Sequence, residues 1–349
     1  MSKHIELHNL IHESCKELDF SGVVLVKQGT EILSESSHDY ANRSDRLPNT
    51  PGTRFGIASG SKLFTSIGIG QLVEKGVLSF DTRLKDCLDI DFPHFDERVT
   101  IHHLLTHTSG IPDYFDEEVM SDFEELWKER PVYHMRSLKD FLPFFQSSQM
   151  KFTPGDRFHY NNAGFILLGL IIEQQTRQSF TDYIESEIFQ KAGMESSGYF
   201  SLDCLPFNTA VGYIEEENSW RTNLYSIPVK GGADGGAFIT ASDMINLWEA
   251  LFSYKLVNEE TTGKLLTPHI HVNGEVHYGY GIWMNQRNEE IYKYHVMGYD
   301  PGVSFRSSYY PGLDLKLSIP SNRESGPFEV TKSIEGYFES IKTDSIILQ

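Results

Sequence analysis

The sequence predicts an α/β fold of the α+β type, in which one antiparallel sheet is built from both ends of the chain and a mostly helical region is inserted between them. Near the start, a Val-rich stretch over 20–27 and its partner over 31–35 flank a Gly turn, as in a strand hairpin. Alternating apolar and aromatic runs return only late, over 278–284, 290–295, 302–309 and 313–319. Strands at both ends, with helices between them, indicate a single sheet that the two ends share.

The helices follow in chain order. Apolar residues at helical spacing predict a first helix over 4–17, and a short strand over 54–58 leads into a helix over 62–74 that ends at Lys75-Gly76. Helices are also expected over 100–106, 137–145 and 181–192, a buried apolar segment over 163–173, and a closing helix over 328–341. We therefore expect a sheet region from 1–58 and 230–349, a mainly helical region from 59–229, and an active site where the two regions meet.

Composition narrows the class of partner. The 349 residues carry a formal net charge of −19 at pH 7. Nucleic acids and anionic membranes bind basic surfaces, so the negative net charge argues against both as partners.

An odd number of widely spaced cysteines (Cys15, Cys87 and Cys204) indicates reduced thiols. The first residues lack the apolar core of a signal peptide, and the longest apolar run is too short to span a bilayer. We expect a cytoplasmic protein with no membrane partner, and the oligomeric state is left open.

Two short segments carry the chemistry. Ser59 and Lys62 are three residues apart, which places a hydroxyl and an amine on one face of a helical turn. About a hundred residues later, Tyr160-Asn161-Asn162 can supply a phenol and an amide to the same pocket. A hydroxyl, an amine and a phenol within reach of one another form a nucleophile with its base. This chemistry is acyl transfer, and it needs neither a metal nor an organic cofactor.

Each segment has a second match, and context decides between them. Ser148 and Lys151 repeat the serine–lysine spacing, and Tyr40-Ala41-Asn42 repeats the tyrosine pattern. Ser59, however, follows a strand and opens a helix, where free backbone N–H groups lie close to its hydroxyl. Ser148 lies in a polar stretch without that setting. We therefore assign the nucleophile to Ser59.

Residues 54–62 resemble the active-site segment of the serine β-lactamase-like superfamily, which includes penicillin-binding proteins, DD-peptidases, class C β-lactamases and related esterases. Residues 104–112, Pro154-Gly155 and residues 235–244 resemble further segments of this group, so that the likeness extends from about residue 20 to the last helix. The resemblance implies a β-lactamase/transpeptidase-like fold. It also implies that Ser59 is acylated, that Lys62 eases its deprotonation, that Tyr160 passes a proton toward the leaving group, and that Asn162 binds Lys62 and the substrate amide.

The third element of this group departs from the usual pattern, Lys-Thr-Gly or His-x-Gly followed by Pro-Gly. Counting back from Pro301-Gly302 puts residues 296–298 on the motif, so His295 stands one position early. Its side chain then points to the other strand face, unless a bulge re-aims it into the substrate site. Gly298 leaves room for the substrate, and the N–H of Tyr299 is the expected second oxyanion donor. Without a cation here, recognition of a substrate carboxylate, as in penicillins or D-alanyl-D-alanine, is weakened.

The sequence thus predicts a serine hydrolase that cleaves an ester or amide of a small molecule or peptide through an acyl-enzyme. Peptidase or penicillin-binding, esterase and β-lactamase activities all stay open. The alternative is a non-catalytic binding or scaffold module with a decayed cleft, which the shifted His295 motivates. A third hypothesis is a metallohydrolase built on His103 and His107, but these histidines lack the glutamate of His-Glu-x-x-His. For His107 a structural role is preferred.

Overall fold

The computed structural model describes residues 3–347. At its centre is an eight-stranded antiparallel sheet in the order β2-β1-β14-β13-β12-β11-β10-β9. Its strands come from two distant parts of the chain, as the sequence predicts: β1 (Gly22–Gln28) and β2 (Glu31–His38), then β9 (Ile270–Asn273), β10 (Val276–Tyr278), β11 (Trp283–Arg287), β12 (Glu290–Asp300), β13 (Val303–Tyr310) and β14 (Leu315–Ser321).

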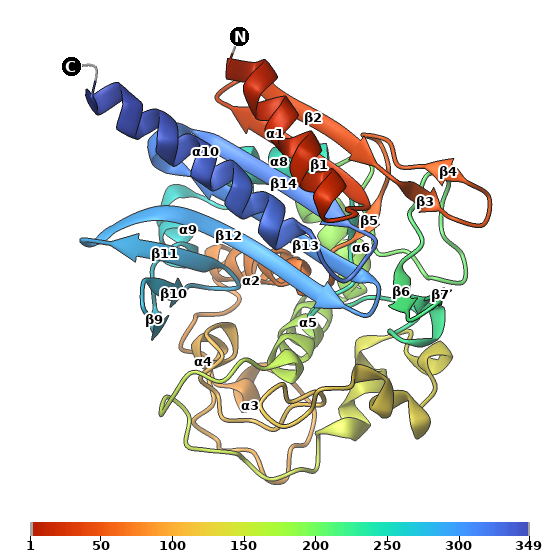
Figure 1. The fold of residues 1–349 in the computed structure, drawn as a ribbon. Coiled ribbons are helices and arrows are strands. Elements are labelled where there is room, and N and C mark those ends of the chain that lie inside the picture. The colour runs from red at the N-terminus through yellow and green to blue at the C-terminus, as the bar shows by residue number, and fades with distance from the viewer. Residues whose placement is uncertain (1–2, 348–349) are drawn as a thin grey trace.

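Helices cover both faces of this sheet. On one face α1 (Lys3–Glu17) and α10 (Pro327–Ile347) lie side by side, and α8 (Ala241–Phe252) packs against the other (Figure 1). Strand β1 shows why both layers are needed. Val24 and Val26 pack with residues of α1 and α10, whereas Val23 and Leu25 pack with residues of α8. Successive side chains of a strand point to opposite faces, so a strand that is apolar throughout is buried on both sides.

Two long helices of the inserted region position the candidate site. These are α2 (Lys62–Glu74) and α5 (Asn162–Thr176), which pack against each other. Their buried residues run without a break over 62–72 and 162–172. A helix that is apolar all round lies inside the protein, which explains the apolar segment over 163–173. Because Lys62 and Asn162 are the first residues of these helices, the two helix starts meet at one point.

The remaining elements are short. They are the helices α3 (Leu84–Cys87), α4 (Ile101–Leu105), α6 (Phe180–Ile184), α7 (Gln190–Ala192) and α9 (Glu259–Leu265); the 3-10 helices η1 (Ala58–Ser61), η2 (Phe123–Lys128), η3 (Val132–His134), η4 (Leu138–Phe144), η6 (Asn223–Tyr225) and η7 (Pro311–Leu313); the π-helix η5 (Glu185–Phe189); and the strands β3 (Tyr40–Asn42), β4 (Leu47–Pro48), β5 (Phe55–Gly56), β6 (Tyr213–Glu216), β7 (Ser219–Thr222) and β8 (Phe238–Ile239). Within residues 3–347, no helix has both the length and the apolar composition needed to cross a membrane.

Two predicted elements are interrupted in the structure. The strand expected over 278–284 is divided into β10 and β11 by a turn that contains Gly281 at φ +70°. The turn docks on α2, since a Cβ at Gly281 would lie 2.2 Å from Ser66 Oγ and 2.8 Å from the Lys62 carbonyl oxygen. The helix expected over 181–192 is a composite of α6, η5 and α7, with a π-helical turn in its middle. In both places packing against α2 replaces a regular element with a local irregularity.

Candidate active site

Ser59 lies in η1, the tight turn between β5 and α2. The preceding residue, Ala58, has a φ of 44°, in the left-handed region that residues with a Cβ seldom occupy. Hydrogen bonds hold this strained turn: the Gly60 N–H donates to the Ile57 carbonyl oxygen at 2.9 Å, and the Ser61 hydroxyl donates to the Ala58 carbonyl oxygen at 2.9 Å. The Ala237 N–H in turn donates to the Ser61 hydroxyl at 3.1 Å. The turn therefore presents Ser59 in a fixed orientation at the start of α2.

The Lys62 amine connects the parts of the site. Its Nζ donates to Ser59 Oγ at 2.9 Å, to Asn162 Oδ1 at 2.8 Å and to the Asp234 carbonyl oxygen at 2.6 Å. The residue is only 2% exposed. The structure thus brings Ser59, Lys62 and Asn162 into direct contact, as the sequence predicts. The Asp234 carbonyl belongs to the Gly-rich stretch over 231–236 and is a partner that the sequence did not reveal.

Burial sets the protonation of Lys62. Low-dielectric surroundings disfavour a charged amine, so burial lowers the pKa of Lys62 below its ordinary value of 10.5. Carboxylates oppose this effect and raise the pKa, in decreasing order Asp234, Glu117, Asp113 and Asp300. The net direction is downward. A larger share of the amine is therefore neutral near physiological pH, and only the neutral amine can accept the Ser59 proton.

Tyr160 lies beside the same two residues. Lys62 Nζ is 4.9 Å from the centre of its ring, and its hydroxyl interacts with the Ser59 side chain. Burial raises the pKa of Tyr160 well above its ordinary value, and the Glu117 carboxylate adds to this, while the Ser59 interaction opposes it. The ring of His107 packs on Tyr160 with centroids 4.4 Å apart. Tyr160 is consequently a neutral phenol that can donate a proton, and the ring of His107 fixes its position.

Asn162 is oriented by Asp113, a residue that sequence reasoning missed. Asp113 Oδ2 accepts the Asn162 N–H at 2.7 Å, and its Oδ1 accepts the Ala163 N–H at 2.9 Å. An acidic side chain suits the positive end of the helix dipole at the start of α5. Burial raises the pKa of Asp113 to about 7, although these backbone hydrogen bonds pull it down. The signal that could have identified it is an Asp in the loop after the Ser109-Gly110 turn, which faces a helix start.

Strand β12 forms the opposite wall. A Cβ added at Gly298 would lie 2.1 Å from the Ile57 carbonyl oxygen and 2.8 Å from Ser59 N, so only glycine allows this approach. The pairing of β11 with β12 ends at His295, which leaves the next residues of β12 to border the Ser59 turn. Tyr299 contributes its main chain to the cavity wall, because its hydroxyl accepts a hydrogen bond from Arg306 Nε at 3.2 Å, away from the site.

The substrate-binding role expected for His295 is not supported. Strand β12 pairs with β13 without a register shift from Tyr294 to Asp300, so the bulge that would re-aim His295 is absent there. His295 therefore faces the side opposite Gly298, like Lys293, which forms an ion pair with Glu335 of α10. Burial also lowers the pKa of His295 well below its ordinary value, with Lys293 acting in the same direction. The imidazole is neutral and does not line the cavity. Val296, two residues before Gly298, takes the motif position and is buried in the hydrophobic core.

The competing motifs lie elsewhere. Ser148 is exposed, and the amine of Lys151 is engaged in an ion pair with Asp116. Tyr40 lies on β3 and does not itself line the cavity, although its carbonyl oxygen accepts a hydrogen bond at 3.0 Å from Nδ2 of Asn322, which does.

Among the described residues, His103 and His107 do not join a third side chain that could complete a metal site. Within the described part of the chain, one group of three side chains could hold a metal, and it consists of Asp116, Glu118 and His159. His107 is instead structural, since its Nδ1 accepts the Asn161 N–H at 3.0 Å and its Nε2 lies 3.0 Å from the Tyr278 hydroxyl.

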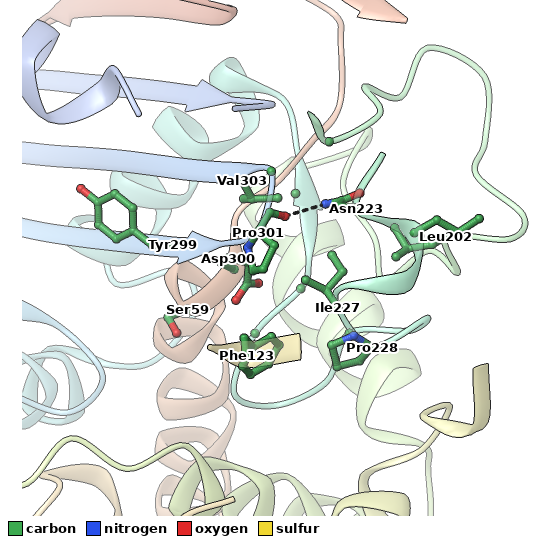
Figure 2. A pocket seen from close by; sticks show the side chains of 18 of the residues that line it. Ser59, Phe123, Leu202, Asn223, Ile227, Pro228, Tyr299, Asp300, Pro301 and Val303 are labelled. Carbon is green, nitrogen blue, oxygen red and sulfur yellow. Dashed lines mark hydrogen bonds between the residues drawn. The ribbon is translucent and has the colours of Figure 1, made fainter. Parts of the chain in front are cut away.

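A cavity of about 750 Å³ opens beside Ser59. Figure 2 shows Ser59 and Asp300 at one end and Leu202 and Ile227 toward the other. The end near Ser59 is polar, whereas the rest is largely apolar; its apolar lining includes Phe123, Phe200, Leu202, Leu205, Ile214, Ile227 and Phe238. The cavity therefore has room for a substrate of moderate size whose apolar group extends away from the nucleophile.

Comparisons with known proteins identify the family of this chain. Residues 8–331 match the Beta-lactamase family model. Penicillin-binding protein 4* of Bacillus subtilis (strain 168) is 30% identical over 340 residues, which cover 93% of this chain and 72% of that protein. The crystal structure of a penicillin binding protein from Bacillus halodurans is 56% identical, with a TM-score of 0.91, and covers 93% of this chain and 99% of that one. The octameric penicillin-binding protein homologue from Pyrococcus abyssi is 28% identical, with a TM-score of 0.80 over 92% and 73% of the two chains. The chain thus belongs to the Beta-lactamase family and is a serine hydrolase that works through an acyl-enzyme.

Proposed function

We propose that this protein hydrolyses small esters or amides, with Ser59 as the acylated nucleophile and Lys62 as its base. One observation carries the proposal: a buried amine with a lowered pKa lies 2.9 Å from the Ser59 hydroxyl and is fixed by two further acceptors. A serine hydroxyl is a weak nucleophile on its own and needs such a base.

In the acylation step, the neutral Lys62 amine takes the Ser59 proton while Oγ attacks the substrate carbonyl. When the tetrahedral intermediate collapses, Tyr160 donates its phenol proton to the leaving group and receives one from the Lys62 ammonium. Asn162 keeps the amine in place through its Oδ1. The backbone N–H groups of Ser59 and Tyr299 are the proposed oxyanion donors, each contributing about 3–4 kcal/mol to transition-state stabilisation. Water then repeats the sequence on the acyl-enzyme, and no step uses a metal or cofactor.

The substrate is proposed to lack an essential carboxylate beside the scissile bond. Val296 occupies the position where this group of enzymes has a cation, and His295 faces away. Arg221 lines the cavity but is engaged with Glu124 at 2.5 Å and with Glu216 at 3.1 Å. Esterase, amidase or peptidase activity is therefore favoured over β-lactamase activity.

Covalent binding of a penicillin is the second candidate, because the Bacillus halodurans penicillin binding protein shares 56% of its residues with this chain. The scaffold alternative rested on His295, and the contacts among Ser59, Lys62 and Asn162 are complete without it. The cytoplasmic location, the division into a sheet region and a helical region as domains, and the number of copies in an assembly stay predictions.

Intact-mass measurement tests the proposal. The wild type, Ser59→Ala and Ser148→Ala are each exposed to a fluorophosphonate and to benzylpenicillin, and the burst and steady rate of p-nitrophenyl acetate hydrolysis are recorded. We expect a single fluorophosphonate adduct and a burst in the wild type and in Ser148→Ala, and neither in Ser59→Ala. Ser148→Ala is the matched control because it removes the other serine of the same spacing. An adduct that persists in Ser59→Ala, or no adduct in the wild type, contradicts the assignment.

A further inference from the structure

Asp300 is a carboxylate of the catalytic cavity that the mechanism above does not use. It follows Gly298 by two residues on β12, so both face the Ser59 side of the strand. In Figure 2 its carboxylate points into the cavity, on the side of Ser59 and Phe123. Among the described residues, no group donates a hydrogen bond to this carboxylate and no cation pairs with it; the charges that act on it are Asp234, Lys62 and Glu117.

The other charges of the cavity do not neutralise Asp300. Glu117 also lines the cavity and has neither a hydrogen bond nor an ion pair within the described part of the chain. The Arg221 guanidinium is engaged with two glutamates, and the Lys230 amine is directed to the Thr181 hydroxyl at 3.5 Å. Lys62 is committed to Ser59 and Asn162. The end of the cavity next to the nucleophile thus presents unpaired negative charge to whatever occupies it.

An unpaired carboxylate in a partly enclosed site is unfavourable, and a bound cation relieves this. Burial raises the pKa of Asp300 to about 7, with Asp234 adding to the shift and Lys62 opposing it. Near pH 7.5 the group is mostly ionised, while an α-amino group with a pKa of about 7.7–8.0 is still largely protonated. The carboxylate of Asp300 and a substrate ammonium group are therefore complementary in charge near pH 7.5.

We propose that Asp300 binds the ammonium group of the substrate, so that the enzyme prefers amides and esters of amino acids whose amino group is free. The inference rests on the hydrolase function proposed above and names its substrate class. It does not depend on acidity alone, because Asp300 lies in the cavity that contains the nucleophile, two residues from the glycine that borders it. The apolar remainder of the cavity, with Leu202 and Ile227, accommodates the side chain of such a substrate.

A substrate series of graded charge tests the proposal. Alanine p-nitroanilide, N-acetylalanine p-nitroanilide and succinylalanine p-nitroanilide carry a positive, a neutral and a negative group at the same position, and both enantiomers are assayed at pH 7.5. We expect kcat/KM to fall in that order. We also expect Asp300→Asn to lower the ratio of alanine to N-acetylalanine p-nitroanilide by about 10- to 100-fold, the range for a charge-assisted hydrogen bond. Glu324→Gln is the matched control, since Glu324 lines the same cavity but accepts the Gly302 N–H at 3.3 Å, and it should keep the ratio.

The outcomes separate the two proposals. If Ser59 is acylated by p-nitrophenyl acetate but the alanine and N-acetylalanine substrates react equally well, the ammonium inference is overturned and the hydrolase function stands. Equal losses on all three anilides in Asp300→Asn also overturn it, because a purely structural role would act on every substrate. If p-nitrophenyl acetate does not acylate Ser59, both proposals fail. Should the anilides be cleaved too slowly, inhibition of p-nitrophenyl acetate hydrolysis by alaninamide and N-acetylalaninamide gives the same ratio.

Discussion

Replacing Gly298 by alanine should impair catalysis far more than it impairs folding. The new Cβ would lie 2.1 Å from the Ile57 carbonyl oxygen, so β12 and the Ser59 turn must separate by 0.9 Å to restore a 3.0 Å contact. Overpacking of this kind costs about 1–3 kcal/mol in the free energy of unfolding. A displacement of about 1 Å at reacting atoms costs about 100-fold in rate, and the loss of an oxyanion donor about 100- to 1000-fold. We therefore expect kcat to fall by about 100- to 1000-fold in a folded protein.

The assay combines kcat for p-nitrophenyl acetate with a thermal unfolding curve. The matched control is Gly263→Ala in α9, where an added Cβ would meet nothing within 4 Å. This variant should keep full activity and gain about 0.5–1 kcal/mol of stability, as expected for alanine in place of glycine inside a helix. If Gly298→Ala kept more than a third of the wild-type kcat while unfolding at a lower temperature, the close approach of β12 to Ser59 would not matter for catalysis, and the reasoning would be refuted.

Three further predictions follow from the buried charges. Asp113→Asn should lose about 1–3 kcal/mol of stability in a denaturant titration. Both oxygens of the Asp113 carboxylate accept backbone N–H groups, from Asn162, Ala163 and Tyr114, whereas an amide has only one oxygen that can accept. An unchanged midpoint of unfolding would contradict this. The rising limb of kcat/KM against pH should lie below the ordinary lysine value of 10.5 and should persist in Tyr160→Phe, since the amine and not the phenol is the group that loses a proton there; a limb that vanishes with the phenol would argue for Tyr160 as the base. Asp300 binds a proton more tightly in the folded state, with a pKa of about 7 against an ordinary 3.8, so wild-type stability falls as pH rises through this window. The melting temperature of Asp300→Asn relative to wild type should therefore increase between pH 4 and pH 8, and a constant difference would count against an unpaired carboxylate.

The centre of the site could be predicted because its chemistry depends on local spacing. Ser59 and Lys62 belong to one helical turn, and Gly298 is identified by its distance from Pro301-Gly302. The sheet could be predicted for a similar reason, since alternating apolar residues mark the strands at both ends of the chain. The choice of Ser59 over Ser148 also depended on local context, and the structure places Ser148 on the surface.

What the sequence could not provide is mostly long-range or carried by the main chain. The carbonyl oxygen of Asp234 binds Lys62, yet any residue type has a carbonyl, so no residue pattern reveals it. Asp113 acts across about fifty positions on Asn162, through backbone N–H groups that only folding brings close. The orientation of His295 depended on whether β12 bulges between His295 and Gly298, a matter of pairing with β13 that the residues of β12 do not determine. The place of Asp300 in the site could have been predicted from the sequence, because its two-residue separation from Gly298 puts both residues on one face of the strand.

The order in which the sheet is assembled has a consequence for synthesis in the cell. Strand β1 has β14 as a neighbour, and the wall opposite Ser59 is supplied by β12. At a translation rate of roughly 5–20 residues per second, Gly298 leaves the ribosome roughly 10–50 s after Ser59. During that interval the nascent chain carries a nucleophile but no completed cleft, so an incomplete chain has no means of attacking cellular esters or amides. Hydrolytic competence thus arises only once the last strands have emerged and joined the first.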